Sequence, residues 1–189
     1  MRLAGGSLLR LGRRRLLALA ALAPAALPAL VRTQDEVPEH NRATLAEPPP
    51  RPPLGTASQR AARLFDAIVT GEPGRADDFF LSREAFRLIK AVPTPDPLWE
   101  RLHRAYARDI LALHAATPDL DRATFVGLRF TGRRGWVVVG EEANRLPYWA
   151  QRHSFLDYSV GSETRHIEVR TMITWADEWF VTHLSEFHR

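Results

Sequence analysis

The last part of the chain, residues 163–184, constrains the fold more than any other segment. Two runs rich in β-branched and aromatic side chains, 163–175 and 179–184, flank a short polar break at 176–178. Such runs favour β-strands, and so short a break predicts an antiparallel hairpin between them. The apolar residues of the final run fall on both faces of a strand: Trp179, Phe180, Val181 and Leu184. We therefore expect this strand either at the centre of the sheet or in a concave sheet that closes over helices.

Further strands are expected upstream of this hairpin. Residues 124–130 and 136–139 have strand patterns, and the loop 131–135 between them combines two glycines with two arginines. This composition predicts a second hairpin, with a tip that either binds an anion or is simply solvated. Residues 148–160 form a longer run that turns at Gly161-Ser162 into the strand beginning at 163.

Helical periodicity is confined to the segment before these strands. The spacing predicts a helix over 58–70 that is capped by Ser58 and ended by Gly71. A short turn over 73–80 and a helix over 82–90 follow, the latter capped by Ser82. A longer helix, capped by Asp96, carries one apolar stripe: Trp99, Leu102, Tyr106, Ile110 and Leu113. Helices followed by strands without alternation indicate an α+β fold, in which N-terminal helices pack on a curved antiparallel sheet of four to five strands.

The N-terminus has the layout of a secretory signal. Basic residues at 10–15 precede an apolar run at 16–31 that is interrupted by Pro24 and Pro28. The run is shorter than the ~20 residues of a spanning helix. We expect export to the periplasm or outside the cell, with an uncleaved membrane anchor as the alternative. Residues 13–17 also resemble a twin-arginine signal. The alternative, which we favour, is the ordinary basic region of a secretory signal.

The remaining organisation follows from composition. We expect a proline-rich linker at 32–57, an extended spacer with no core to join, and a single domain at 58–189. Six of the 26 basic residues lie within 1–32, which leaves 20 basic against 22 acidic side chains, a net charge of −2. This balance gives no support to nucleic-acid binding. The absence of cysteine excludes disulfides and thiolate chemistry. Lys90 is the only lysine beside 25 arginines.

The order of elements and the closing hairpin resemble the NTF2-like (SnoaL-type) superfamily over residues 58–189. Members often end in a W-x-DG-x-W-x-V hairpin, and the corresponding segment here begins at Trp175 and has Glu178 in place of the glycine. The resemblance implies a cone with an interior pocket. Because that superfamily includes isomerases, dehydratases, cyclases and non-enzymatic binding modules, the fold alone selects no function.

One polar group of residues is predicted by the register of the hairpin at Gly161-Ser162. If Val160 pairs with Glu163, then Asp157 lies opposite His166. Opposed residues have Cβ atoms about 5 Å apart, close enough for a carboxylate to orient an imidazole as a general base. Catalytic members of the resembled family use an Asp/His pair in the pocket. The alternative, which we favour, is that this is the solvated outside of the sheet with cross-strand charge pairs.

The same register places three more ionisable residues beside this pair: His153, Glu168 and Arg170. Together with Tyr148 and Trp149, they are the candidate ligand-binding residues. We expect a non-catalytic exported domain that binds a small apolar molecule or an envelope protein, with no metal or cofactor. One alternative is a cofactor-free isomerase, dehydratase or hydrolase that uses His166 and Asp157. Another is a structural or dimerising module that forms a homodimer through the open sheet face. We expect membrane contact only through an uncleaved N-terminal segment.

Overall fold

The computed structural model describes residues 37–45, 47–131 and 134–185. From residue 37 onward these belong to one compact unit. The predictions for the N-terminal signal and for an anion-binding loop tip at Arg133 lie outside the described residues. Within the described part, no helix is long and apolar enough to cross a bilayer.

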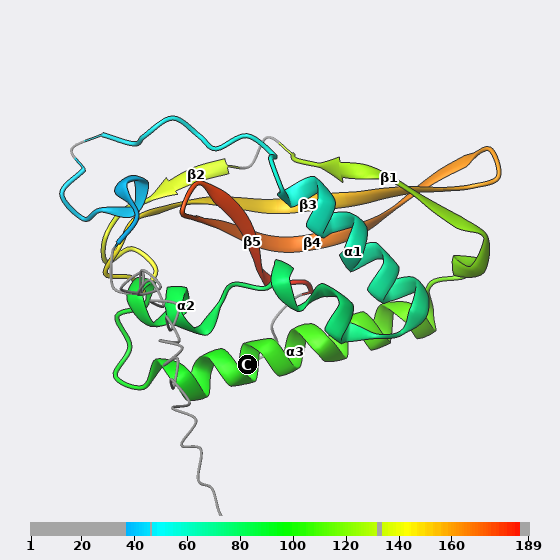
Figure 1. Cartoon of the computed structure of the whole chain (residues 1–189), viewed down its shortest axis with the longest axis horizontal. Helices are drawn as coiled ribbons and strands as arrows, with labels where there is room; N and C mark the ends of the chain where they lie inside the picture. Colours follow the sequence, from blue (N-terminus) through cyan, green and yellow to red (C-terminus); the bar gives the residue numbers. More distant parts are fainter. Residues whose placement is uncertain (1–36, 46, 132–133, 186–189) are drawn as a thin grey trace, which may run out of the picture. The chain divides into compact units, whose positions relative to one another are not determined.

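The described elements follow the predicted order of helices and then strands. The α-helices are α1 (Ala57–Thr70), α2 (Arg83–Ile89) and α3 (Pro95–Ala116), and short 3-10 turns are η1 (Glu39–Asn41), η2 (Pro73–Phe79) and η3 (Leu120–Arg122). The strands are β1 (Ala123–Arg129), β2 (Arg134–Val137), β3 (Tyr148–Val160), β4 (Glu163–Trp175) and β5 (Glu178–His183). They form an open, curved antiparallel sheet (Figure 1). The α+β class is confirmed.

Two predicted helix ends are confirmed, and two predicted caps are wrong. Gly71 ends α1 in the left-handed conformation, and the Ser82 hydroxyl accepts a hydrogen bond from the Ala85 amide. Ser58 lies inside α1, which begins one residue earlier. Asp96 lies in the first turn of α3, because the helix begins at Pro95 and the Asp96 carboxylate pairs with Arg87.

The β3–β4 hairpin has the predicted register. Val160 pairs with Glu163 across the turn, and the ladder continues through Asp157 opposite His166. The predicted hairpin between β1 and β2 is wrong. Both strands pair with β3, β1 along residues 155–160 and β2 along 148–151. They therefore lie along one edge of β3, one after the other.

The strand β5 lies at the edge of the sheet, in the order β1-β3-β4-β5. Of the two predicted settings, the central position is therefore wrong. Its outer edge is covered by the segment between η2 and α2, where the Leu81 amide donates to the Val181 carbonyl at 3.0 Å. This cover protects the backbone of an edge strand that is apolar on both faces, with Trp179 and Val181 fully buried on one face and Phe180 half-buried on the other.

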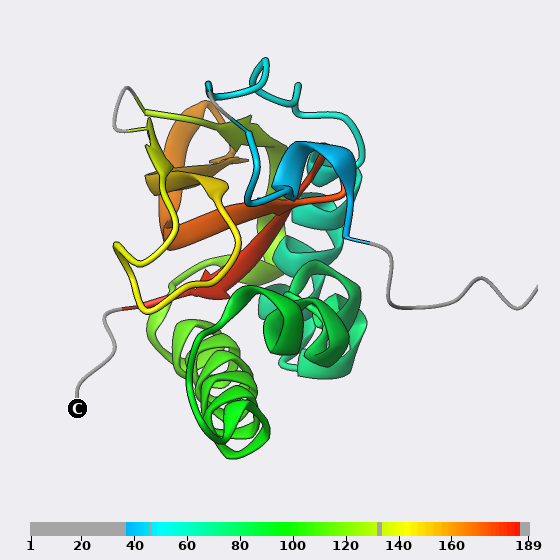
Figure 2. The same cartoon turned by 90° about the vertical axis from the view of Figure 1, so that its left-hand side faces the viewer.

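One face of the β3–β4 hairpin packs on the helices, and we call it the inner face. Its buried residues include Leu156, Tyr158, Ile167 and Val169. Facing these residues, the predicted apolar stripe of α3 contributes Leu102, Tyr106 and Ile110 to the same core. Figure 2 shows α2 and α3 on the side of the sheet opposite to the proline-rich segment. The outer face carries Asp157 and His166.

The proline-rich segment lies against the domain, and the expectation of a spacer with no core to join does not hold for it. The Trp149 indole donates to the Pro49 carbonyl at 3.2 Å, and the Trp179 indole donates to Pro52 at 3.1 Å. An extended proline-rich chain makes no internal hydrogen bonds, so its carbonyls are available to such donors. Asn41 is buried and donates to the Pro147 carbonyl. The folded unit therefore begins well before Ser58.

Candidate functional site: a cavity between the helices and the inner face

A cavity of about 520 Å³ lies where α2 and α3 meet the inner face. Four apolar residues line it: Phe86 from α2, Leu98 and Leu102 from α3, and Ile173 from β4. Its ionisable residues are Lys90, Arg101, Glu142, Tyr148, Arg152 and His183, and Thr171 and Thr182 complete the lining. The volume lies in the range of small-molecule sites, and polar groups from several elements converge on the apolar side chains.

Lys90 enters the cavity from the end of α2. Its amide donates to the Phe86 carbonyl and closes the helix, and Lys90 itself has an extended backbone conformation. Its carbonyl accepts two hydrogen bonds from the Arg145 guanidinium, at 3.0 and 2.8 Å. The Arg145 amide also donates to Ile89 at 2.7 Å. These contacts fix the backbone of Lys90 against the loop 138–147.

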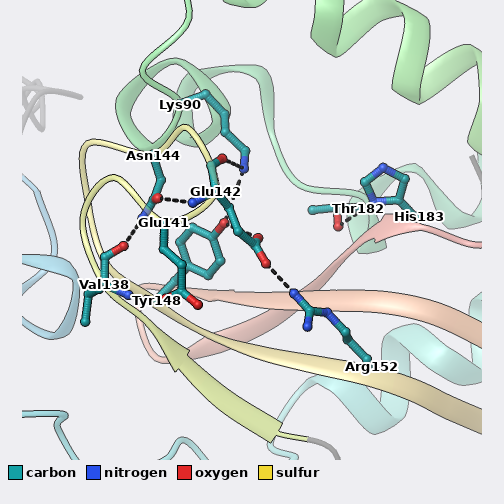
Figure 3. Close-up of polar contacts among 9 residues, drawn as sticks. All are labelled: Lys90, Val138, Glu141, Glu142, Asn144, Tyr148, Arg152, Thr182 and His183. Atoms are coloured by element: carbon teal, nitrogen blue, oxygen red, sulfur yellow. Dashed lines mark hydrogen bonds and ion pairs between the residues drawn. The ribbon is translucent and has the colours of Figure 1, made fainter. Parts of the chain in front are cut away.

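That loop is organised by the buried side chain of Asn144. The Asn144 amide group donates to the carbonyls of Val138 and Leu146, and its oxygen accepts from the Glu142 amide. A short polar side chain that replaces missing backbone partners is the mechanism by which asparagine stabilises irregular loops. The consequence is that Glu142 is held over the cavity, close to Lys90 and to the start of β3 (Figure 3).

The side chains of Lys90, Tyr148 and Glu142 form a directional chain of hydrogen bonds. The Lys90 Nζ donates to the Tyr148 hydroxyl at 3.2 Å and to the Glu142 carbonyl at 3.2 Å. The Tyr148 hydroxyl in turn donates to Glu142 Oε2 at 2.8 Å. Arg152 pairs with the other carboxylate oxygen, as Figure 3 shows. All four residues of this hydrogen-bonded group line the cavity.

Burial shifts the titration of three groups in the cavity. Loss of hydration lowers the pKa of Lys90, against a smaller opposing effect of the Glu142 charge. Burial and the hydrogen bond to Glu142 raise the pKa of Tyr148, so its hydroxyl stays protonated. Burial also lowers the pKa of His183, and the charge of Lys90 lowers it further. Shifted groups inside a cavity are a physical mark of a functional site.

The predicted catalytic pair lies on the outer face. Asp157 lies opposite His166 as predicted, but its carboxylate accepts two hydrogen bonds from Arg129, at 2.7 and 2.9 Å. The exposed His166 imidazole packs edge-on against Phe155, with ring centroids 4.9 Å apart. The Asp157 carboxylate is therefore already held by Arg129, which takes two of its acceptor positions.

The other predicted residues divide between the two faces. On the outer face, His153 Nδ1 lies 2.5 Å from Glu168 Oε1, and Arg170 Nη1 lies 3.7 Å from the same oxygen. Trp149 holds the proline-rich segment. Tyr148 lines the cavity. Among the residues that the structure describes, no group of His, Asp and Glu side chains is placed to hold a metal ion.

Sequence reasoning missed Lys90, Glu142 and Arg152 as a site. The one available signal was that Lys90 is the only lysine in an arginine-rich chain. Glu142 lies in a polar loop and Arg152 in the middle of a strand, where charged residues are ordinarily solvated. Nothing local indicates that the loop folds back onto the end of α2.

Comparison with known proteins adds no assignment to these observations. The chain matches no protein-family model, no curated protein and no solved structure.

Proposed function

We propose that this domain binds a small organic anion with an apolar body in the cavity between α2, α3 and the inner face. The observation that carries this is the composition of the lining. Four apolar side chains accompany three cationic groups, Lys90, Arg101 and Arg152, and one acidic group, Glu142. With Lys90 protonated, the four charged side chains sum to +2. A carboxylate of the ligand would complement this excess charge, and the apolar wall would take its hydrocarbon part.

The proposal keeps the expectation of a small, largely apolar ligand and adds an anionic group. Helices that cover one face of a curved sheet, with a cavity between the layers, also support the proposed NTF2-like relationship. Export, an envelope-protein partner and homodimer formation stay predictions. The alternative of catalysis by His166 and Asp157 likewise stays a prediction, and the pairing of Asp157 with Arg129 does not favour it.

The experiment compares two probes that share one apolar body, 3-phenylpropionate and 3-phenylpropan-1-ol. Calorimetric titration of the full chain should detect the carboxylate binding more tightly, with an affinity that falls as salt is raised. Arg101→Gln and Arg152→Gln should each weaken binding of the carboxylate about fivefold, the effect of a partly exposed charge pair. Neither variant should change binding of the alcohol.

Arg108→Gln is the matched control, because Arg108 is an exposed residue of α3 that does not line the cavity. It should leave both affinities unchanged. Equal binding of the two probes, or binding of neither, would overturn the proposal.

A further inference from the structure

We propose that the Lys90 amine forms a covalent imine with an aldehyde or ketone bound in the cavity. This inference deepens the proposed function, on whose cavity it rests, by naming the ligand class as a carbonyl compound such as a 2-oxo acid. The observations that carry it are the position of Lys90 in the cavity wall and the hydrogen-bonded chain that starts at its nitrogen.

Lys90 Nζ is held by two acceptors, the Glu142 carbonyl and the Tyr148 hydroxyl, each 3.2 Å away. A neutral amine has two N–H donors and one lone pair. With both donors engaged by these acceptors, the lone pair is left for a bond to a carbonyl carbon. The backbone contacts from Arg145 keep the base of this side chain in place. Imine formation requires such an oriented, unprotonated nitrogen.

The surroundings increase the fraction of Lys90 that is unprotonated. The ionisable side chains that line the cavity together with Lys90 are Tyr148 and Arg152 from β3, Glu142 from the 138–147 loop, Arg101 from α3 and His183 from β5. Burial lowers the pKa of Lys90, and the Glu142 charge opposes this only in part. The neutral fraction near pH 7 is therefore larger than for a solvated lysine.

Tyr148 and Glu142 supply a path for the protons that the reaction moves. The Nζ lone pair forms a bond to the carbonyl carbon, and the π pair of the C=O bond moves onto oxygen. One N–H proton passes to Tyr148 while the Tyr148 proton passes to Glu142, along the 3.2 and 2.8 Å contacts, and Glu142 delivers a proton to that oxygen, which becomes a hydroxyl. The second N–H proton follows the same path to the hydroxyl, which leaves as water while nitrogen completes the C=N bond, so that both amine protons end in the water.

The proposed anion site sets the orientation of a 2-oxo acid in this step. Its carboxylate would lie toward Arg101 or Arg152, and the adjacent carbonyl carbon toward Lys90. The imine needs no cofactor, and its only by-product is water.

The test is reductive trapping in the full chain with sodium cyanoborohydride, which reduces the imine to a stable secondary amine. The probes are phenylpyruvate and phenylacetone, which share one apolar body and differ in the carboxylate. Each adduct adds the mass of the probe less one oxygen atom. Because Lys90 is the only lysine, peptide mass spectrometry has only two amines to distinguish, Lys90 and the N-terminus.

We expect Lys90 to be labelled about tenfold faster, or more, than free Nα-acetyl-lysine in the same solution, the scale of general acid–base assistance. Labelling of Lys90 no faster than of this free amine would overturn the inference, and this comparison needs no variant. Lys90→Arg should abolish the adduct at that peptide.

Tyr148→Phe should slow trapping about tenfold. Tyr158→Phe is the matched control, because Tyr158 is a buried tyrosine of the same strand that packs on Phe65 outside the cavity. Equal rates in the two tyrosine variants would contradict the proton path. Binding of 3-phenylpropionate without trapping of either ketone would overturn the imine inference but not the proposed anion site. Trapping of both ketones at equal rates, without binding of 3-phenylpropionate, would overturn the anion site but not the imine.

Discussion

The two faces of the β3–β4 hairpin carry similar ionisable side chains in different surroundings. On the outer face, Glu168 accepts contacts from His153 and Arg170, and Asp157 pairs with Arg129. On the inner side, Glu142 accepts contacts from Tyr148 and Arg152, next to Lys90. Both faces therefore present a carboxylate between a cation and a second polar group.

The ion pairs themselves are similarly exposed: Arg129 and Asp157 keep 53% and 18% of their side-chain exposure, and Arg152 and Glu142 keep 55% and 32%, so the solvent screens both pairs. The difference between the faces lies beside Glu142, in a buried tyrosine and a cavity. Tyr148 is fully buried, and its hydroxyl and the Lys90 amine meet at the wall of a cavity. The comparison shows that the kinds of residue present do not make a site. A site also requires burial of its polar groups and a cavity beside them.

The largest expected effect separates two neighbours on β3, Leu156 on the inner face and Phe155 on the outer face. Leu156→Ala should lower the free energy of unfolding by about 2–5 kcal/mol, because Leu156 is fully buried in the core. Phe155→Ala removes a larger but half-buried side chain that contacts Arg129 and His166, and should cost about 1 kcal/mol. Urea denaturation measures both. Equal losses would break the distinction between the faces.

A smaller effect compares the two carboxylates. Glu142→Gln should destabilise the domain by about 1–3 kcal/mol, because it weakens the partners of a buried tyrosine hydroxyl and of Arg152. Glu168→Gln is the matched control on the outer face and should change stability by no more than about 0.5 kcal/mol. Thermal unfolding monitored by circular dichroism distinguishes them. A larger loss for Glu168→Gln would contradict the comparison.

The smallest effect is a pH dependence that arises at His183. Burial lowers its pKa below the 6.5 of an unperturbed imidazole, so the unfolded chain binds the extra proton first as the pH falls. The contribution of neutral His183 to the free energy of unfolding is fully present above pH 6.5, and it is lost as the pH falls below that value. One proton contributes a slope of at most about 1.4 kcal/mol per pH unit. His183→Asn should flatten the stability curve between pH 6.5 and 5, as measured by urea midpoints. An unchanged curve would show that His183 is not desolvated.

Much of the fold follows from local pattern. Alternation and composition predicted β3 and β4, and the Gly161-Ser162 turn fixed their register, since a slip of one residue would reverse every side chain. The helix stripe from Trp99 to Leu113 and the end of α1 at Gly71 are likewise local properties. The wrong caps at Ser58 and Asp96 differ from the structure by one or two residues, where neighbouring starts have similar free energies.

The larger errors concern contacts between distant segments. β1 and β2 have the pattern of a hairpin but both pair with β3, because a long strand offers an edge to each of them. The proline-rich segment lacks an apolar pattern of its own. Its position depends on indole donors in Trp149 and Trp179, about a hundred or more residues later in the chain.

The sequence by itself determined the class of fold, the central hairpin and the division of that hairpin into an apolar and a charged face. These properties depend on the periods of strands and helices, which a short segment expresses. Only the tertiary structure decided which polar groups lie beside a cavity. Lys90, Glu142 and Tyr148 come together because Asn144 folds a loop onto the end of α2, and that loop carries no periodic signal. The shifted pKa values of Lys90 and Tyr148 depend on burial, which the completed packing sets.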